Sequence, residues 1–417
     1  MMAPEGKRLL ILGGNRYNVL SIRAARRAGF VTLVADRNPE APGLREADIP
    51  LAVDLFDYER LIAAVRANGG VNGVVSMAEA GVRPAAHLAA HFGLPSISEE
   101  AASNATSKAA MRRLWADTGF STDFAVVETE EAAISASDRM TFPLIIKPDR
   151  SFGGSRGVSR VESRNQVGSA FRFAFASGLR GTSVLLEPCL EGTEHSCEVL
   201  IYEGRSSVLC IGQKVKSPYP YRVDASVLYP ADLSAHQQRL VARMCHEAAL
   251  RLGHTRGVAH VEFALTATGP VLFELGARCG GGHTPQIAHA VSGVDEFVEV
   301  CRIAVGGMPK QFRPLFRKGA DYHFLVLKPG KVAEVYIPEE VKNHPAILDV
   351  GVTVAPGEEI LPVRTTSERA GFIVTTGRDA LEAAALADWA CKKIIIRYAD
   401  GPSACASSTA SIHHLSN

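Results

Sequence analysis

The chain has 417 residues, which is too long for one hydrophobic core and predicts two to four domains. Its 45 basic residues are balanced by 44 acidic residues, and this near neutrality excludes a strong overall attraction to nucleic acid or to an anionic membrane. Any phosphate binding must therefore depend on local groups.

Targeting and membrane signals are not evident. The start, MMAPEGKRLLILGG, lacks the apolar segment and small-residue cleavage site of a signal peptide. No apolar run approaches the roughly 20 residues that cross a bilayer. The eight cysteines include no C-x-x-C pair, which is typical of free thiols in a reducing compartment. We expect a cytoplasmic protein.

Residues 7–100 alternate strand and helix patterns. KRLLILGG, FVTLVAD and VNGVVSM have the pattern of buried strands, and residues 18–29, 61–68 and 82–92 have helical spacing. This alternation predicts a doubly wound, parallel, Rossmann-like sheet. The turn GGNRYN lacks the full G-x-G-x-x-G spacing, so that NAD binding through this turn and Asp36 remains an alternative to a purely structural sheet.

The rest of the chain mixes strands and helices in a less regular order. Thr106 or Ser107 is a suitable N-cap for the next helix. We expect a strand in PLIIKP, a long helix over residues 235–253, a hairpin within residues 258–283 and a final helix over residues 380–397. Residues 401–417 are small and polar, which predicts a disordered tail.

Two lysines are candidates for phosphate binding. Lys147 lies in an apolar strand, where a charge needs an anionic partner, and Lys108 lies near a helix start. Taken singly, a solvated helix lysine and a strand lysine that extends to solvent remain alternatives. Directly after Lys147, residues 151–157 read SFGGSRG. Such a glycine-rich loop can turn several N–H groups toward phosphate, although alone it is also typical of a flexible hairpin.

Two glutamates suggest a cation site. Glu262 and Glu274 lie twelve residues apart, on either side of a turn at Gly269 and Pro270. A hairpin folded there brings both carboxylates together, and they repel each other unless a cation such as Mg²⁺ lies between them. The alternative is two unrelated glutamates on an edge strand. Arg278 follows, with a guanidinium suited to phosphate oxygens, and the glycines at 280–282 leave a bare backbone for a substrate.

In this order the motifs resemble the ATP-grasp superfamily, and most closely the L-amino-acid ligases and the biotin-carboxylase-like branch. The resemblance implies an α/β and α+β fold over nearly the whole chain. It implies a Rossmann-like domain (1–105), a small lobe with a glycine-rich lid (106–190), a large lobe with the metal-binding hairpin (191–320), a C-terminal α+β domain (321–400) and the tail (401–417).

The resemblance also implies roles for single residues. Arg278 and Lys147 are the catalytic candidates, and Glu262 and Glu274 are the metal ligands. The candidates for ATP binding are Lys108, Lys147, Gly153, Gly154, Ser155, Gly157, Glu187, Pro188, Cys189, Leu190, Glu194 and Lys214. One departure is Gly276, where the family often has an asparagine ligand, and it leaves open whether one or two Mg²⁺ ions (or Mn²⁺ in their place) bind.

The implied reaction is the joining of a carboxylate to an amine or amino acid. ATP would convert the carboxylate into an acyl phosphate, with release of ADP and phosphate. The alternatives are a carboxylase that activates bicarbonate, which the absence of a biotin-carrier signature disfavours, a purine-type formyl or carboxylate ligase, and a non-enzymatic nucleotide-binding regulator. By position, the substrate candidates are His283, Arg256, His260, Gly281, Tyr219, Tyr221 and Arg222. The resemblance implies small-molecule substrates and a homodimer, with no nucleic-acid or membrane partner.

Overall fold

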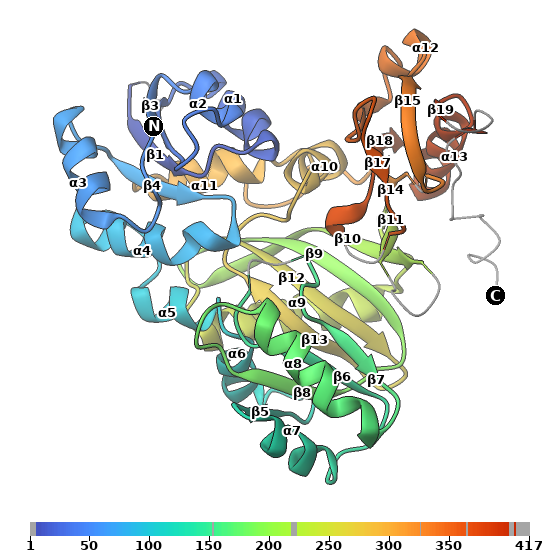
Figure 1. Ribbon diagram of the computed structural model, residues 1–417. Helices are drawn as coiled ribbons and strands as arrows, with labels where there is room; N and C mark the ends of the chain where they lie inside the picture. The colour runs from blue at the N-terminus through green and yellow to red at the C-terminus, as the bar shows by residue number, and fades with distance from the viewer. Residues whose placement is uncertain are drawn as a thin grey trace.

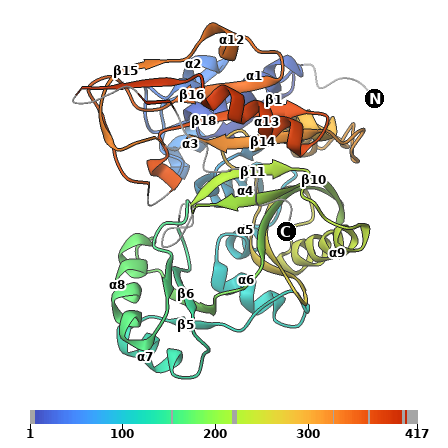
Figure 2. The same cartoon turned by 90° about the vertical axis from the view of Figure 1, so that its right-hand side faces the viewer.

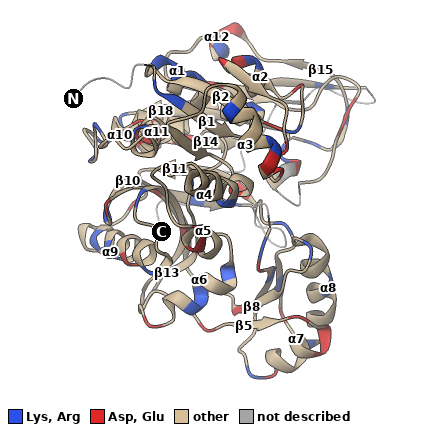
Figure 3. Ribbon diagram, turned by 90° about the vertical axis from the view of Figure 1, so that its left-hand side faces the viewer, with Lys and Arg blue, Asp and Glu red and all other residues tan. Residues whose placement is uncertain are grey.

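The structure is a computed structural model that describes residues 6–151, 154–217, 223–325, 327–363, 366–399 and 404–405 (Figure 1). Within these ranges the strands form three four-stranded sheets and one eight-stranded sheet. None of the helices in these ranges has both the length and the apolar character needed to cross a membrane. Basic and acidic residues are interspersed along the helices, in keeping with the near-zero net charge (Figure 3).

The N-terminal domain is the predicted parallel sheet. Its strand order is β3 (Ile49–Leu51), β2 (Val31–Ala35), β1 (Arg8–Leu12) and β4 (Gly73–Ser76). Its helices are α1 (Val19–Arg27), α2 (Pro42–Glu46), α3 (Tyr58–Ala67) and α4 (Val82–His91). Leu9 and Ile11 enter the core on one face of β1, and Leu10 and Leu12 enter the core on the other. Helices on both faces explain why the strand is a continuous apolar run. Asp36 accepts a hydrogen bond from Gly14 N at 2.8 Å and so holds the first turn.

The small lobe is an antiparallel sheet with two helices. The strand order is β5 (Ala125–Val127), β8 (Val184–Pro188), β6 (Leu144–Pro148) and β7 (Ser159–Val161). Helices α7 (Glu130–Ser137) and α8 (Val167–Ser177) pack against it through a core that includes Ala133, Leu144 and Phe171. Lys147 lies near the end of strand β6, beside this core, and is buried.

The large lobe is built on the eight-stranded antiparallel sheet. Its strand order is β13 (Gly269–Gly276), β12 (Gly257–Thr266), β9 (Thr193–Tyr202), β10 (Arg205–Lys216), β11 (Asp224–Tyr229), β14 (Gly319–Phe324), β18 (Gly371–Gly377) and β16 (Ile347–Val352). Helices α9 (Ala235–Leu252) and α6 (Lys108–Trp115) share its core, where Trp115 Nε1 donates to Ala248 O at 3.2 Å. Helix α6, expected within the small-lobe range, thus packs on the large lobe.

The C-terminal part continues this sheet and adds a second one. Strand β14 pairs with β11 of the large lobe. The boundary expected at residue 320 therefore falls within one continuous sheet. The second sheet has the order β17 (Glu359–Ile360), β15 (Gly330–Tyr336), β19 (Ile395–Tyr398) and β20 (Ala404–Cys405). The remaining elements are the helices α5 (Glu99–Asn104), α10 (Thr284–Ser292), α11 (Glu296–Ala304), α12 (Glu339–Lys342) and α13 (Ala380–Cys391), and the 3₁₀ turns η1 (Arg16–Asn18), η2 (Glu79–Gly81), η3 (Arg164–Gln166) and η4 (Thr366–Glu368).

One sequence expectation for this region is wrong. The helix expected over residues 380–397 ends at Cys391, and Ile395–Tyr398 forms β19, since the β-branched run Ile394 to Ile396 favours a strand. In the expected disordered tail, Ala404 and Cys405 pair with β19. The other residues from 400 to 417 lie outside the described ranges.

The two lobes lie side by side, below the N-terminal and C-terminal parts in the view of Figure 2. Helix α11 packs against the N-terminal sheet, because Phe297 and Cys301 share a core with Leu9 and Ile11. The segment from Ala277 to His283 therefore runs from the large-lobe hairpin to the helices that hold the N-terminal domain.

Candidate active site

The predicted hairpin brings its two glutamates together. Glu262 on β12 and Glu274 on β13 are direct cross-strand partners, with a bulge just after Glu262 and the turn between Thr266 and Gly269. Their side chains are 25% and 24% exposed, so both lie at an accessible edge of the core. Cross-strand partners have their Cβ atoms about 5 Å apart, within the reach of one shared cation.

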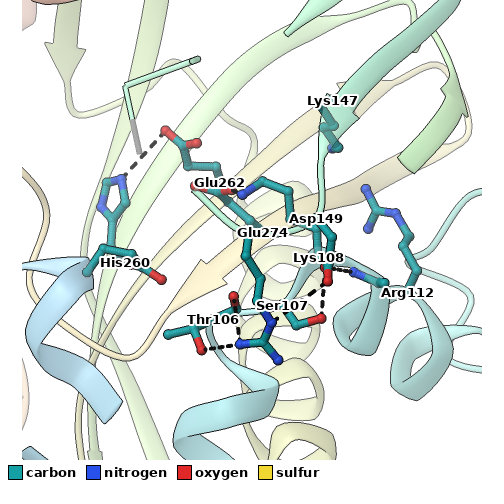
Figure 4. Close-up of polar contacts among 12 residues, drawn as sticks. Thr106, Ser107, Lys108, Arg112, Lys147, Asp149, His260, Glu262 and Glu274 are labelled. Atoms are coloured by element: carbon teal, nitrogen blue, oxygen red, sulfur yellow. Dashed lines mark hydrogen bonds and ion pairs between the residues drawn. The ribbon is translucent and has the colours of Figure 1, made fainter. Parts of the chain in front are cut away.

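Glu262 and Glu274 lie close together in Figure 4, and each is paired with a lysine. Lys108 Nζ lies 2.9 Å from Glu274 Oε2, and Lys214 forms an ion pair with Glu262. The Lys108 ammonium and the cation-rich surroundings hold the pKa of Glu274 below its ordinary value. Burial opposes ionisation of Glu262, but Lys214 and His260 hold its pKa well below the ordinary value. The hairpin thus presents two full negative charges, each balanced by one ammonium group.

Lys108 is fixed by the start of helix α6. Ser107 caps the helix by accepting a hydrogen bond from Ala110 N, and its hydroxyl donates to Asp149 Oδ1 at 2.8 Å. The same Asp149 oxygen accepts a hydrogen bond from Ala109 N at 2.8 Å. Asp149 follows β6 directly, so one carboxylate ties the end of the Lys147 strand to the helix that carries Lys108.

Lys147 belongs to a separate, almost fully buried ion cluster. Its Nζ lies 2.6 Å from Glu187 Oε2, and Arg112 on α6 pairs with the other Glu187 oxygen. Burial alone would raise the pKa of Glu187, but Arg112 and Lys147 lower it to about 2. Burial lowers the pKa of Lys147, and Glu187 offsets only part of that effect. Two cations on one carboxylate leave an excess positive charge beside the hairpin.

The other nucleotide candidates are spread over the lobe junction. The Cys189 amide already donates to Pro143 O at 2.8 Å, next to Pro188, which pairs with Leu144. Leu190 is half-buried and follows directly. Glu194 accepts from Lys216 Nζ at 2.7 Å, at the start of β9.

The glycine-rich segment after β6 has an unusual backbone. Gly154, Ser155 and Gly157 all have positive φ, at 75°, 58° and 72°. Positive φ in a residue with a side chain is uncommon and typical of tight or functional loops. A Cβ on Gly157 would lie 2.7 Å from Ser177 Cβ, whereas the space around Gly154 is open. The close contact with Ser177 thus explains why residue 157 is a glycine. The open space at Gly154 leaves room for a ligand to approach its backbone. Gly153 lies outside the described residues.

Arg278 is held by the N-terminal domain. Its Nε donates to Glu79 Oε2 at 3.1 Å, and its Nη1 donates to Cys279 O at 2.9 Å. The arginine side chain is 13% exposed and that of Glu79 is 19% exposed. A Cβ on Gly276 would lie 3.2 Å from Arg278 Cζ and 3.3 Å from Glu79 Oε2. The glycine at this position therefore gives the Arg278–Glu79 pair its space, where an asparagine would crowd it.

The substrate candidates do not all gather at one point. His260 Nε2 lies 3.6 Å from Glu262 Oε1, beside the hairpin. His283 Nε2 lies 2.7 Å from Asp349 Oδ2, and its ring is packed against Tyr322 and Phe372 in the C-terminal part. Nothing lies within 4 Å of a Cβ built on Gly281.

Arg256 lies in a different place. It lines a small cavity of 70 Å³ between the N-terminal sheet and β12, to which Arg278 also contributes. The remaining substrate candidates, Tyr219, Tyr221 and Arg222, lie outside the described residues.

Several residues of the site were not predicted from the sequence. Arg112 had a local signal, because it lies one helical turn after Lys108 and so shares its side of the helix. Asp149, two residues after Lys147, had a weaker signal. Glu79 and Glu198 had none, since each contacts a residue far along the chain: Glu79 binds Arg278, and Glu198 binds His260 and Gly280.

The arrangement fits a nucleotide and a hard cation. Among the described residues, no group of three or more His, Cys, Asp and Glu side chains is placed to hold a metal ion unaided. However, Mg²⁺ is usually bound by one or two carboxylates together with phosphate and water oxygens. The two facing carboxylates supply the right donor atoms, and the surrounding lysines suit the phosphates.

Two family profiles match parts of the chain. The profile described as ATP-grasp domain matches residues 140–286, and the profile described as L-amino acid ligase C-terminal domain 2 matches residues 323–399. Residues 140–286 therefore form an ATP-grasp domain. The ATP-grasp match covers Lys147, Glu187, the Glu262–Glu274 hairpin and Arg278, and therefore most of the site described above.

Individual relatives are distant. An L-amino acid ligase from Bacillus licheniformis superimposes with a TM-score of 0.81 at 23% identity, over 95% of this chain and 100% of that one. Carnosine synthase 1 of Homo sapiens is 24% identical over 73% of this chain, and the matched region spans only 40% of that protein. The uncharacterized protein y4rH of Sinorhizobium fredii is 24% identical over 88% of this chain and 78% of its own length. The two profiles, together with the carnosine synthase match, support an ATP-dependent enzyme that ligates a carboxylate to an amine.

Proposed function

We propose that this ATP-grasp enzyme activates a carboxylic acid as an acyl phosphate and joins it to an amine, with an amino acid as at least one substrate. The observation that carries the proposal is the facing pair Glu262 and Glu274, each balanced by a lysine. The amino-acid class rests on the ligase C-terminal profile and on the kinds of relative that match, an L-amino acid ligase and a carnosine synthase.

The ion pairs of the hairpin suggest how the site receives its substrates. In the structure Lys108 and Lys214 neutralise the two glutamates. A nucleotide that arrives with Mg²⁺ brings cation and phosphates together, so the glutamates can turn to the cation and the lysines to the phosphates. Such an exchange of partners keeps every buried charge compensated. Bound Mg²⁺ would supply charge neutralisation at the phosphates.

The remaining assignments follow from position. Lys147 lies in the region with excess positive charge and is suited to the inner phosphates. The segment from Gly154 to Gly157 would cover the phosphates through its amides. The backbone from Glu187 to Leu190 would border the adenine. The Cys189 amide is already bonded to Pro143, which leaves carbonyl groups and the next amide for the base. Glu194 would accept hydrogen bonds from the ribose.

The chemistry needs no side-chain nucleophile. A carboxylate oxygen of the substrate attacks the γ-phosphorus, the bond to the β-phosphate oxygen breaks, and ADP leaves. The amine nitrogen then attacks the acyl carbon, phosphate leaves with the C–O bond electrons, and the amine loses a proton. Arg278, held by Glu79, would stabilise oxygens that gain charge in both steps. Its guanidinium does not lose its charge at working pH.

The test is ADP release measured with a panel of carboxylic acids, each with and without amino acids, and with the products identified by mass spectrometry. We expect ADP and phosphate only when an acid is present, and a new amide when an amino acid is added. AMP and pyrophosphate would contradict acyl-phosphate chemistry. ADP formation that requires bicarbonate and biotin would instead indicate a carboxylase.

The metal assignment has its own variant. Glu274→Gln should remove most ATP turnover, because it deletes a negatively charged ligand from a hard-cation site. Near-normal turnover in this variant would contradict the assignment. Glu46→Gln, on an exposed pair with Arg23, provides a matched control that should turn over ATP as the wild type does.

Two properties stay predictions. We place the protein in the cytoplasm, in keeping with its thiols: seven cysteines in the described ranges are free, and six of these are buried. We also expect a homodimer, which sedimentation of the purified protein would test.

A further inference from the structure

Glu198 lies behind the hairpin, on the central strand β9, and its side chain is 1% exposed. It lies directly opposite His260 in the sheet register. One carboxylate oxygen is bonded to His260 Nδ1, and the other accepts a hydrogen bond from Gly280 N at 2.9 Å. A single buried carboxylate thus holds both an imidazole on β12 and the first amide of the bare glycine segment at 280–282.

His260 continues the contact toward the hairpin. With Nδ1 bonded to Glu198, its other nitrogen, Nε2, faces Glu262 Oε1 at 3.6 Å (Figure 4). Glu262 also pairs with Lys214. The side chains therefore form a continuous series from Glu198 through His260 to Glu262, and Glu198 determines which way the imidazole points.

The glycine at 280 shows how closely this series is packed. A Cβ on Gly280 would lie 2.7 Å from Glu198 Oε1 and would also collide with Thr284. The close approach of backbone and carboxylate thus requires glycine here. Because residues 280–282 follow Arg278 directly, the position of Glu198 also determines where the segment after Arg278 begins.

A second buried acid lies close to Glu198. Glu296, at the start of α11, is fully buried. Burial first, and then the neighbouring Glu198, raise the pKa of Glu296 well above its ordinary value. Glu198, by contrast, is the acceptor that holds His260 and Gly280.

From this geometry we infer that Glu198 is a positioning residue that orients Glu262 for metal binding through His260 and fixes the glycine segment after Arg278. The inference rests on the proposed function, because it takes Glu262 as a metal ligand. Groups that orient a ligand from behind typically change metal affinity by 10- to 100-fold when they are removed.

The test is Mn²⁺ binding in the presence of ADP, followed by electron paramagnetic resonance on the full-length protein. Glu198→Gln preserves size and can still accept from Gly280 N, but it no longer presents a carboxylate to His260. We expect its Mn²⁺ affinity to fall about 10- to 100-fold. Its affinity for ADP without metal should stay within about twofold, because the change acts through the metal ligand.

Two further variants make the result decisive. His260→Asn should show the same loss of Mn²⁺ affinity, and the double variant should be no worse than either single variant, as expected for residues that act in series. Glu296→Gln keeps the size of the buried side chain next to Glu198 and is the matched control for packing, with Mn²⁺ affinity near that of the wild type.

The outcomes separate this inference from the proposed function. Wild-type Mn²⁺ affinity in either Glu198→Gln or His260→Asn overturns the positioning role, even if the other variant does not fold. An equal loss in Glu296→Gln also overturns it, since the effect would then be general packing. If the wild-type protein with ADP binds no Mn²⁺, the metal assignment of Glu262 and Glu274 fails, and the positioning role fails with it.

Discussion

Helix α6 serves two ion clusters that differ in almost every respect. Arg112 faces a buried cluster with Lys147 and Glu187, whose side chains are 1%, 8% and 5% exposed. One turn earlier, Lys108 faces the hairpin pairs, defined here as Lys108–Glu274 and Lys214–Glu262, whose side chains are between 9% and 25% exposed. The buried cluster has two cations for one anion, whereas the hairpin pairs are balanced.

The difference separates a structural role from a functional one. A buried charge that loses its partner is strongly destabilising, so the partners in the buried cluster cannot readily exchange. The hairpin pairs are more accessible, and an incoming cation and phosphates can replace each lysine–glutamate contact with equivalent ones. Under the proposed function, the buried cluster would shape a fixed positive surface, and the hairpin pairs would provide the exchangeable partners.

The largest expected effect comes from breaking the buried cluster. Glu187→Gln leaves Arg112 and Lys147 buried without a negative charge, and we expect a loss of about 3–5 kcal/mol in the free energy of unfolding. Urea denaturation measures it. Glu46→Gln, on the exposed pair with Arg23, should leave the midpoint nearly unchanged. Similar midpoints for the two variants would contradict the structural role of the buried cluster.

The stability that the same cluster contributes depends on pH. The pKa of Glu187 in the folded state is about 2, below the ordinary value of 4.5. The unfolded state therefore binds more protons between these values, and stability rises with pH. The contribution of Glu187 is present above about pH 4.5 and is lost as the pH falls through about 2. In Glu187→Gln the difference from wild type should shrink over that acid range.

The meeting of the two hairpin glutamates was predictable because it is local. Glu262 and Glu274 flank one turn in two alternating strands, so their spacing sufficed to predict that they would meet, and the structure confirms it. The fold class was predictable for a related reason, since strands and helices alternate clearly before residue 100. Lys147 was recognised as buried because its neighbours are apolar.

The partners of these residues were not predictable, because they depend on tertiary packing. Glu187 was expected among the ATP-binding residues, and no local pattern showed that its side chain would be the counter-ion of Arg112 and Lys147. The Arg278–Glu79 pair joins residues 199 positions apart, which no local pattern specifies. The end of the last helix was missed because small apolar residues suit a helix of any length until the strand-forming isoleucines begin.

A smaller effect on folding, but a large one on rate, is expected at Arg278. Arg278→Lys keeps the charge near Glu79 but loses the planar fork. We expect unchanged ATP binding and a rate lowered roughly 10²-fold, the usual scale for one lost oxyanion donor. Single-turnover ADP release and nucleotide titration measure the two quantities. Arg251→Lys, on an exposed pair with Asp117, is the matched control. A rate within a factor of a few of wild type would mean that Arg278 only packs against Glu79.

The smallest expected effect concerns a buried pair that is remote from the hairpin. In β14, His323 Nδ1 lies 3.2 Å from Asp321 Oδ2, and both side chains are 1% exposed. Burial alone would lower the pKa of His323, but Asp321 and the nearby Cys391 raise it to about 10. The folded state thus binds a proton that the unfolded state releases near pH 6.5, so this pair stabilises the protein fully below about pH 6.5. That stabilisation is lost as the pH rises through about 10.

His323→Gln should remove this contribution, at a cost of about 1.5 kcal/mol near neutral pH. Urea denaturation at a series of pH values should show the wild type losing its advantage over the variant from pH 6.5 upward. ADP release at pH 7 should stay near the wild-type rate, because the pair does not contact the hairpin pairs or Arg278. A constant difference in stability across that pH range would show that His323 is neutral in the folded protein. A large loss of activity without a loss of stability would mean that β14, which continues the large-lobe sheet, also contributes to the reaction.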